Sequence, residues 1–407
     1  MQRHQILVVG GGSGGLAVTA SLLKRRPSLD IAVIEPSDQH FYQPGWTMVG
    51  GGVFGAERTV RSAASVLPAG AKRIKGTATA FDPERQTVTL DDGREVGYDY
   101  LIMATGIFLD WNGIPGLAEA LGKNGVTSNY RFDLAPYTWK LVQEMQKGRA
   151  VFSQPPMPIK CPGAPQKGMY LSCSDWQRRG TLGQIEVQFH TATPGLFGVA
   201  DYVPPLMKYV ERYGAKLNFG SRLTAVDGAA KTATFARADA DGTPVETVVE
   251  FDMLHAVPPQ KPVAAVAQSP LADAAGFVEV DQATLRHTRF ANVFGLGDGC
   301  STPNSKTAAA ARKQAPIVAV NLLAVIDGKE PRAAYDGYGS CPLTVEHGRA
   351  ILAEFGYGGK LLPSFPWDST KVRRSAWFLK STFIPWLYWN AMLKGREWLA
   401  APLEKHQ

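Results

Sequence analysis

The stretch Ile6-Leu7-Val8-Val9-Gly10-Gly11-Gly12-Ser13-Gly14-Gly15 decides the fold. Four apolar residues in a row are typical of a strand buried in a parallel sheet. Residues 16–26 then have helical character, and residues 31–34 form a second apolar run that leads into Glu35. A strand, a glycine-rich turn, a helix and a second strand together predict a βαβ unit and an α/β fold with a parallel sheet.

The glycines of this turn have the spacing G-x-G-x-x-G, which is typical of a dinucleotide-binding loop. Gly10 permits the tight turn, Gly12 lets the backbone approach a pyrophosphate, and Gly15 lets the helix pack closely on the strand. The N-terminus of the helix offers free N–H groups to the phosphates. Glu35 can accept both hydroxyls of a ribose, and it would repel the 2′-phosphate of NADP. The alternative is a glycine-rich loop without a ligand.

Two later segments favour FAD over NAD. Residues 100–106 (YLIMATG) and 292–298 (NVFGLGD) are predicted strands with polar ends, and residues 307–323 are helical and rich in alanine. Together with the first loop, they resemble the flavoproteins with two dinucleotide-binding domains. The resemblance implies two Rossmann-like α/β domains in the glutathione-reductase-like arrangement, with Asp298 on the ribityl chain of FAD.

Composition excludes several classes of protein. The chain has 407 residues, of which 45% are apolar and 19% charged, and its net charge is +7. This mixture excludes a disordered or collagen-like chain, and four cysteines are too few for a disulfide scaffold. No run of about 20 apolar residues predicts a membrane-spanning helix. We expect no secretory signal at the start of the chain and no metal ion.

The inserted domain, residues 149–285, lacks the second nucleotide fingerprint of such flavoproteins. Its predicted first strand, residues 150–153, is followed by QPPMPIKCPGAP, where prolines at positions 155, 156, 158 and 162 remove N–H groups that a pyrophosphate would need. Residues 191–195, after the next predicted strand, carry neither a glycine pattern nor a pair of arginines. We therefore expect this domain to have lost its nicotinamide site, so that the electrons come from another donor.

The four cysteines divide into two candidates for chemistry and two for the core. Cys161 replaces the phosphate loop and lies between two lysines near the start of a predicted helix, surroundings that favour a thiolate. Cys341 lies in a turn-rich segment, whereas Cys173 and Cys300 are expected to be core residues. The absence of C-x-x-C and C-x₄-C pairs argues against dithiols of the thioredoxin-reductase and glutathione-reductase types. A distant pair of cysteines that meets at the flavin stays open.

Five segments make the resemblance more specific. They are HFYQPGWT (40–47), KCPGAPQK (160–167), HAVPP (255–259), SKTAAA (305–310) and YDGYGSCP (335–342). These segments resemble the sulfide:quinone oxidoreductase family, in the branch that includes the mitochondrial enzymes, over almost the whole chain. The family's two redox cysteines fall on Cys161 and Cys341. Other branches carry a third essential cysteine in the first half of the chain, and this sequence has none before Cys161.

The resemblance also implies which residues bind FAD and the quinone. The FAD residues are Gly10, Gly12, Ser13, Gly14 and Gly15 at the pyrophosphate, Glu35 at the ribose, Ala78 at the adenine through its backbone, and Gln43, Thr105, Gly106, Asp298 and Lys306 along the rest of the cofactor. Phe355 and Lys371 are the candidates for the quinone site.

The activity that the resemblance implies is the oxidation of sulfide. Hydrosulfide attacks a disulfide or sulfur-bridged pair formed by Cys161 and Cys341, and Cys341 leaves as a persulfide. Cys161 becomes a thiolate that Lys160 and Lys167 stabilise, unless these lysines are only solvated surface charge. Two electrons pass through FAD to a membrane quinone. The sulfane sulfur passes to a small acceptor, namely sulfide, sulfite or a thiol, or ends as polysulfide.

The C-terminal region, residues 331–407, predicts contact with the surface of a lipid bilayer. Residues 371–396 hold six basic residues, no acidic one and several aromatic ones, and Pro385 is expected to split them into two short helices. This pattern is typical of an interfacial anchor on anionic lipid, from which a quinone is accessible. The alternative is a helix docked on the core or at a dimer interface. We expect a peripheral protein on the cytoplasmic face of a bacterial inner membrane, and no nucleic acid partner.

The predicted FAD domain comprises residues 1–148 and 286–330, and a homodimer is a further candidate assembly. Two other enzymes share parts of the pattern. A type II NADH:quinone oxidoreductase needs an intact nicotinamide loop, and the flavoprotein subunit of a sulfide dehydrogenase should carry an export signal. A redox-silent flavoprotein that acts as a membrane adaptor would show no flavin bleaching by sulfide.

Overall fold

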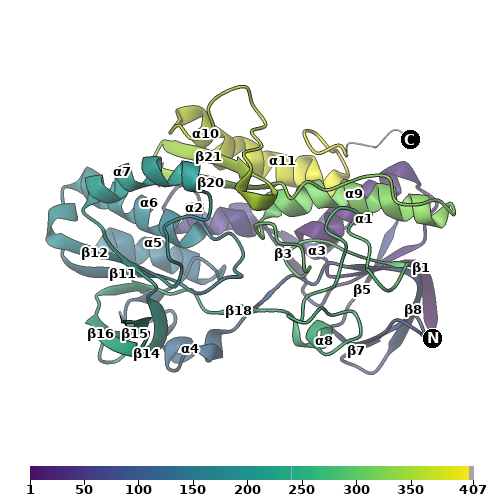
Figure 1. The fold of residues 1–407 in the computed structure, drawn as a ribbon, viewed down its shortest axis with the longest axis horizontal. Helices are drawn as coiled ribbons and strands as arrows, with labels where there is room; N and C mark the ends of the chain where they lie inside the picture. The colour runs from purple at the N-terminus through teal and green to yellow at the C-terminus, as the bar shows by residue number, and fades with distance from the viewer. Residues whose placement is uncertain (240, 403–407) are drawn as a thin grey trace.

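The computed structural model describes residues 1–239 and 241–402. Two largely parallel sheets lie side by side under a layer of helices (Figure 1). This arrangement confirms the expected α/β class with two Rossmann-like units. The last five residues of the predicted C-terminal region lie outside the described part of the chain.

The first sheet is built around β1 (Gln2–Val9), the strand that the opening motif predicts. β1 pairs in parallel with β2 (Ile31–Ile34) and with β8 (Glu95–Met103). Because it is covered on both faces, Ile6, Leu7 and Val8 are fully buried. The strand order is β5-β2-β1-β8-β7-β6, and β19 also pairs with β8. The other strands are β5 (Ala71–Ile74), β6 (Ala78–Asp82), β7 (Thr87–Leu90) and β19 (Val293–Gly295).

Two long helices pack together on the first sheet. α1 (Ser13–Arg25) follows β1, and α9 (Ala308–Ile326) lies along it (Figure 1). Within the described chain, α9 is the one helix long and apolar enough to cross a membrane by length and composition, which the sequence expectation had excluded. The structure buries 67% of its apolar window, as in the core helix of a globular protein.

The second sheet has five parallel strands in the order β10-β17-β11-β12-β13. They are β10 (Val126–Thr127), β11 (Gly148–Gln154), β12 (Ile185–Thr191), β13 (Lys216–Phe219) and β17 (Met253–His255). Its longer helices are α5 (Leu134–Glu144), α6 (Ala164–Arg179) and α7 (Val203–Tyr213). An antiparallel sheet of β14 (Arg222–Asp227), β15 (Thr232–Ala238) and β16 (Pro244–Glu250) lies below it (Figure 1).

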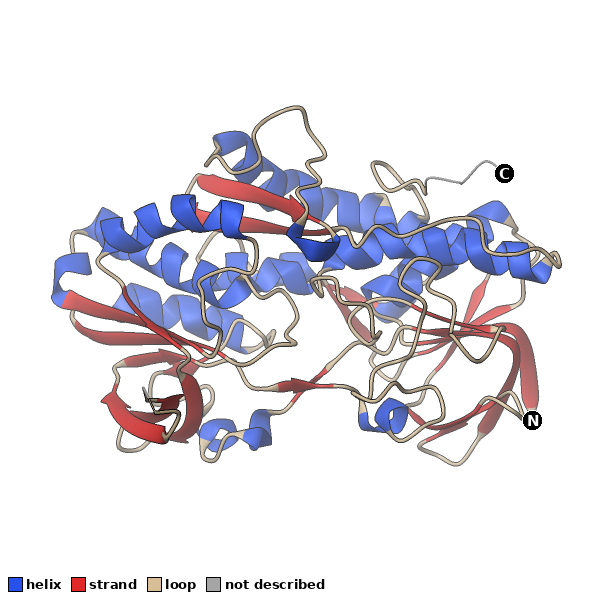
Figure 2. Cartoon of the chain, viewed as in Figure 1, coloured by secondary structure: helices blue, strands red, loops and turns tan. Residues whose placement is uncertain are grey.

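Short elements connect these units. β9 and β18 form the ribbon that runs between the two halves (Figure 2). The short elements are α2 (Trp46–Gly50), α3 (Ala63–Val66), α4 (Leu117–Ala120), α8 (Ala264–Ala267), β3 (Gln39–Phe41), β4 (Val60–Ser62), β9 (Phe108–Leu109) and β18 (Gln260–Lys261).

The C-terminal region begins with a hairpin of β20 (Gly339–Glu346) and β21 (Arg349–Phe355), which packs on α6. Three helical segments follow without a break, namely α10 (Arg374–Phe378), a π-helix (Leu379–Phe383) and α11 (Ile384–Asn390). Pro385 therefore does not split the segment, contrary to expectation. It lies in the first turn of α11, directly after the π-helix, whose wider turn is a common way to accommodate a helical proline.

Candidate active site

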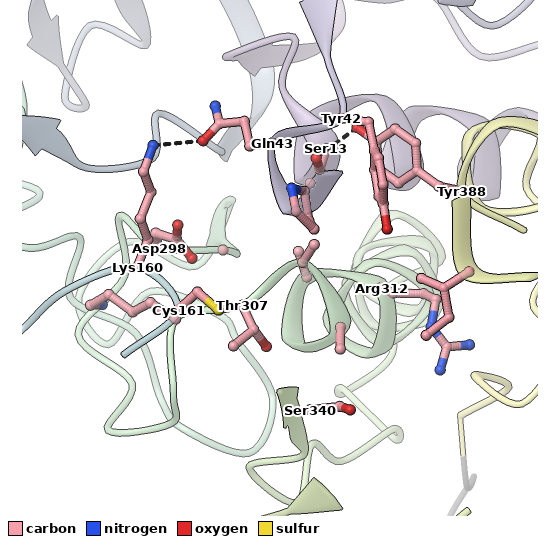
Figure 3. Close-up of a pocket in the computed structure, with 18 of the residues that line it drawn as sticks. Ser13, Tyr42, Gln43, Lys160, Cys161, Asp298, Thr307, Arg312, Ser340 and Tyr388 are labelled. Carbon is pink, nitrogen blue, oxygen red and sulfur yellow. Dashed lines mark hydrogen bonds between the residues drawn. The ribbon is translucent and has the colours of Figure 1, made fainter. Parts of the chain in front are cut away.

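A cavity of about 410 Å³ brings together the turn after β1 and the turn after β11 (Figure 3). Cys161 lines this cavity. Of the predicted cofactor residues, the cavity lining includes Gly10, Gly12, Ser13, Gly14, Glu35, Gln43, Thr105, Gly106, Asp298 and Lys306. The structure therefore places the predicted dinucleotide loop and a predicted redox cysteine at one site.

The turn between β1 and α1 leaves room for a phosphate group. No side chain caps the start of α1, and a Cβ atom on Gly12 would meet no atom within 4 Å. A Cβ atom on Gly15 would lie 1.8 Å from the carbonyl oxygen of Gly10, so Gly15 is required for close packing and does not itself line the cavity. The uncapped N–H groups of α1 thus open onto space that an anion can fill.

Other polar groups at the cavity also fit a large polar cofactor. Glu35 follows β2 and accepts hydrogen bonds from the backbone N–H groups of Gly11 (2.9 Å) and Ser37 (2.8 Å), which fixes its carboxylate at the cavity edge. The Thr105 hydroxyl and both side-chain amide atoms of Asn129 are buried at the cavity without a hydrogen-bond partner among the residues that the structure describes. Unpaired buried polar groups are costly, so these atoms are suited to partners on FAD.

Besides Gly15, Ala78 is a predicted cofactor residue that does not line the cavity. It begins β6, on the edge of the first sheet. Its proposed backbone contact with adenine therefore stays a prediction.

Charged residues meet at the middle of the cavity. The Lys160 ammonium donates a hydrogen bond of 2.6 Å to the Gln43 side chain (Figure 3). Burial lowers the pKa of Lys160 to about 8, although Asp298 and Cys161 act in the opposite direction. Burial raises the pKa of Asp298, and the positive charges of Lys306 and Lys160 oppose this rise.

The two predicted redox cysteines lie next to each other although they are 180 residues apart in the chain. Their Sγ atoms are 3.6 Å apart, which is a hydrogen-bonding distance between two sulfurs and longer than the ~2.05 Å of a disulfide bond. Cys161 precedes α6 and Cys341 lies on β20. A Cβ atom on Gly163 would lie 2.6 Å from Cys341 Sγ, so glycine at this position lets the start of α6 approach β20.

The backbone of Cys161 is held in an uncommon conformation. Its φ angle is +50°, in the left-handed region that few non-glycine residues adopt. Its N–H group donates to the Lys306 carbonyl at 2.7 Å, and the Tyr130 hydroxyl donates toward the Lys160 and Cys161 carbonyls. A strained backbone that several hydrogen bonds hold in place is typical of functional sites.

A buried lysine, Lys167, lies within hydrogen-bonding distance of both cysteine sulfurs. Lys167 Nζ is 3.1 Å from Cys161 Sγ and 3.5 Å from Cys341 Sγ. The hydrogen bond with Cys341, together with the charges of Lys167 and Lys380, holds the pKa of Cys161 well below its ordinary value against the effect of burial. The same hydrogen bond and burial raise the pKa of Cys341 well above its ordinary value. The directions of these two shifts favour the thiolate on Cys161 over a thiolate on Cys341.

Lys380 is a site residue that the sequence analysis assigned to the lipid anchor. It is 3% exposed, lines the cavity, and donates a hydrogen bond of 2.8 Å to the Pro44 carbonyl. Burial, followed by repulsion from Lys167, lowers the pKa of Lys380 to about 7. The basic stretch 371–396 therefore does not face outward as a whole, which its sequence pattern did not indicate.

The two quinone candidates lie away from the cavity. Phe355 is buried against Phe197 and Tyr202, and Lys371 is exposed, with its Nζ 3.7 Å from Asp368. The C-terminal segment 379–399 supplies apolar lining that the sequence analysis missed, including Leu379, Phe383, Ile384, Leu387, Met392 and Leu399. Cys173 and Cys300 are fully buried, and burial raises the pKa of both, as expected for core residues.

The fold and the site define a flavoprotein-type oxidoreductase, and residues 4–142 match the family described as Pyridine nucleotide-disulphide oxidoreductase. The chain is 42% identical to the mitochondrial sulfide:quinone oxidoreductase of Dictyostelium discoideum, over 96% of this chain and 86% of that protein. It is 39% identical to the mitochondrial sulfide:quinone oxidoreductase of Mus musculus, over 96% of this chain and 87% of that protein. The chain belongs to the sulfide:quinone oxidoreductase family.

A solved structure has the same fold. The sulfide:quinone oxidoreductase of Aquifex aeolicus superposes with a TM-score of 0.81 at 21% identity, and the match covers 98% of this chain and 92% of that one. This agreement extends over both parallel sheets and the C-terminal region.

Proposed function

We propose that this chain oxidises sulfide at the Cys161/Cys341 pair and passes two electrons through FAD to a quinone. The observation that carries the proposal is the 3.6 Å contact of the two sulfurs beside Lys167, because Cys161 and Lys167 line the cavity that reaches the dinucleotide loop. The membership of the family supports sulfide and quinone as the substrates.

The chemistry of the cysteine pair follows from its electrostatics. In the oxidised pair, hydrosulfide forms a bond to the Cys341 sulfur while the bond between the two cysteines breaks. Cys341 then carries a persulfide, and Cys161 leaves as a thiolate, which Lys167 stabilises. The outer sulfur passes to a nucleophilic acceptor such as sulfide, sulfite or a thiol. Reoxidation of the two remaining sulfurs to the resting pair then releases two electrons.

FAD supplies the two-electron acceptor that this cycle requires. The open cradle at Gly12, the uncapped start of α1 and the unpartnered amide of Asn129 support its placement in the cavity. Asp298 and Lys306 would flank its ribityl chain and flavin end.

We place the quinone at the apolar part of the cavity that the C-terminal helix lines. On the outside of this region, Phe378, Trp386 and Trp398 are 57%, 44% and 49% exposed. Exposed aromatic residues next to basic ones favour the headgroup region of a bilayer, from which a quinone could enter. Several relatives are named mitochondrial. The cytoplasmic face of a bacterial inner membrane and a homodimer stay predictions from the sequence.

Anaerobic mixing with sulfide tests the proposal. Sulfide should bleach the flavin absorbance of the wild type, while Cys161→Ser and Cys341→Ser should each abolish the bleaching and keep bound FAD. Cys173→Ser, at a buried cysteine outside the cavity, is the matched control and should bleach normally. Wild-type rates in either of the first two variants would contradict the role of that cysteine.

The alternative, a type II NADH:quinone oxidoreductase, makes a different prediction in the same experiment. NADH alone would bleach the flavin in that case. The start of α6 argues against it, because Cys161 and the buried Gln166 and Lys167 take up the position where a nicotinamide dinucleotide would need a glycine-rich loop.

A further inference from the structure

The C-terminal segment 384–397 is joined to the dinucleotide loop by hydrogen bonds that the function above does not use. The Tyr388 hydroxyl lies 2.7 Å from Ser13 Oγ, as Figure 3 shows, and 2.6 Å from His40 Nε2. His40 Nδ1 in turn lies 3.1 Å from the Gly11 carbonyl oxygen. Tyr388 and His40 are 2% and 4% exposed, so water does not compete for these contacts.

The direction of each hydrogen bond can be assigned. Because a carbonyl oxygen only accepts, His40 Nδ1 carries the proton and donates to Gly11. Burial lowers the pKa of His40 to about 4, so the ring is neutral and its Nε2 accepts from Tyr388. The Tyr388 oxygen then accepts from the Ser13 hydroxyl. These hydrogen bonds link Ser13 to Gly11 through Tyr388 and His40, and so hold the backbone on both sides of Gly12.

The end of the segment is also attached to α1. A Cβ atom on Gly395 would lie 2.6 Å from the Ala20 carbonyl oxygen, so the backbones are in close contact. Glu397 accepts hydrogen bonds from Ser21 (2.7 Å) and Arg25 (2.8 Å). The short 3-10 helix Met392–Lys394, which follows α11, packs on α1. The segment thus crosses the helix whose N-terminus faces the proposed pyrophosphate site.

We propose that the segment 384–397 is part of the FAD site, and that Tyr388 ties the retention of FAD to the docking of this segment. Tyr388 is a positioning residue, because it acts on the phosphate loop through Ser13 and His40. The outer face of the same segment carries the exposed Trp386. A bilayer that binds this face holds the segment in its docked position, so lipid binding slows the loss of FAD. This inference rests on the proposed function for the identity of the cofactor.

The release of FAD from the holoenzyme tests the inference independently of sulfide oxidation. Free-flavin fluorescence after dilution reports the release rate of wild type, Tyr388→Phe and the control Tyr209→Phe, whose hydroxyl bonds Glu346 away from the cavity. Loss of the two buried hydrogen bonds of the Tyr388 hydroxyl, to Ser13 and His40, predicts release at least about fivefold faster in Tyr388→Phe and unchanged in the control. An unchanged release rate in Tyr388→Phe would overturn the proposal.

Vesicles of phosphatidylcholine and phosphatidylglycerol test whether lipid binding slows FAD release through Tyr388, or whether Tyr388→Phe only destabilises the FAD site. They should slow FAD release at least twofold in wild type and leave it unchanged in Tyr388→Phe. Equal slowing in both proteins, or in neither, would overturn the coupling. If Tyr388→Phe does not yield holoenzyme, Glu397→Gln replaces it and should release FAD about threefold faster; an unchanged rate there would contradict the inference. Sulfide bleaching of the wild type, measured separately, tests the proposed function.

Discussion

The β1–α1 turn and the β11–α6 turn occupy equivalent places in the two parallel sheets, each at the carboxyl end of a buried strand and before a helix. The first turn has almost no side chains, and its helix begins without a cap, beside open space. The second turn carries Cys161, and the buried Lys167 lies one turn into its helix. Both positions favour negative charge, because a helix N-terminus is positively polarised.

The difference lies in which anion each turn can hold. A pyrophosphate needs several free N–H groups and a close approach, which glycines provide. A thiolate needs a single sulfur held near a cation and shielded from water, which Cys161 and Lys167 provide. In the proposed function, the same strand-turn-helix arrangement would bind the cofactor in one sheet and hold the redox cysteine in the other.

The largest expected effect comes from adding a methyl group to each turn. Gly15→Ala would place a Cβ atom 1.8 Å from backbone at Gly10, so the loop must move, and we expect a protein without bound FAD. Gly163→Ala would place its Cβ atom 2.6 Å from the Cys341 sulfur, so we expect bound FAD but no bleaching by sulfide. Flavin content and anaerobic absorbance check both outcomes.

Either of two results would contradict the contrast between the turns. One is full flavin content in Gly15→Ala, which would show that the loop tolerates a side chain. The other is a wild-type rate of bleaching in Gly163→Ala, which would show that the contact between α6 and Cys341 does not control the cysteine pair.

A smaller effect is expected when the cation of the second turn is removed. Lys167→Met keeps the volume of the side chain but removes the charge that lies 3.1 Å from Cys161, so the pKa of this cysteine should rise. Alkylation by iodoacetamide as a function of pH should show about tenfold lower reactivity at neutral pH. Lys140→Met, at an exposed lysine paired with Glu144, is the control and should react like wild type. Equal reactivity of Lys167→Met and wild type would assign the thiolate to another cause.

Local patterns predicted the first turn well. The glycine spacing, the acid after β2 and the Gly-Asp end of β19 are all set by short-range geometry, so the cavity contains Gly12, Glu35 and Asp298 as expected. The contact of Cys161 with Cys341 joins distant parts of the chain, and only the family resemblance indicated it before the structure did.

The C-terminal helix shows why the rest could not be predicted. A lysine in an aromatic, basic stretch is most often at the surface, and the pattern alone does not distinguish Lys380, which is buried, from Lys371, which is exposed. Likewise, Tyr388 meets Ser13 across 375 positions of the chain. Which face of a short amphipathic helix turns inward depends on the shape of the cavity that receives it, and this shape exists only after the two sheets have formed.

The smallest expected effect concerns Lys380 and the stability of the fold. Its pKa falls from 10.5 to about 7, because burial and then Lys167 disfavour the charged form. Between these values the unfolded chain binds a proton that the folded protein does not, so this lysine lowers stability progressively as the pH falls from 10.5 to about 7. Lys380→Met removes this cost. Its free energy of unfolding relative to wild type should therefore be more favourable at pH 6 than at pH 9, by on the order of 2 kcal/mol.

Urea unfolding at the two pH values measures this difference. Lys394→Met, at an exposed lysine of the same region, should show none. The hydrogen bond to Pro44 is lost at both pH values, and it largely cancels from the comparison. If Lys380→Met shows the same relative stability at pH 6 and pH 9, then Lys380 keeps its ordinary pKa. It would then contribute a full positive charge to the thiolate at Cys161 throughout this range, and the second turn would have two permanent cations in place of one.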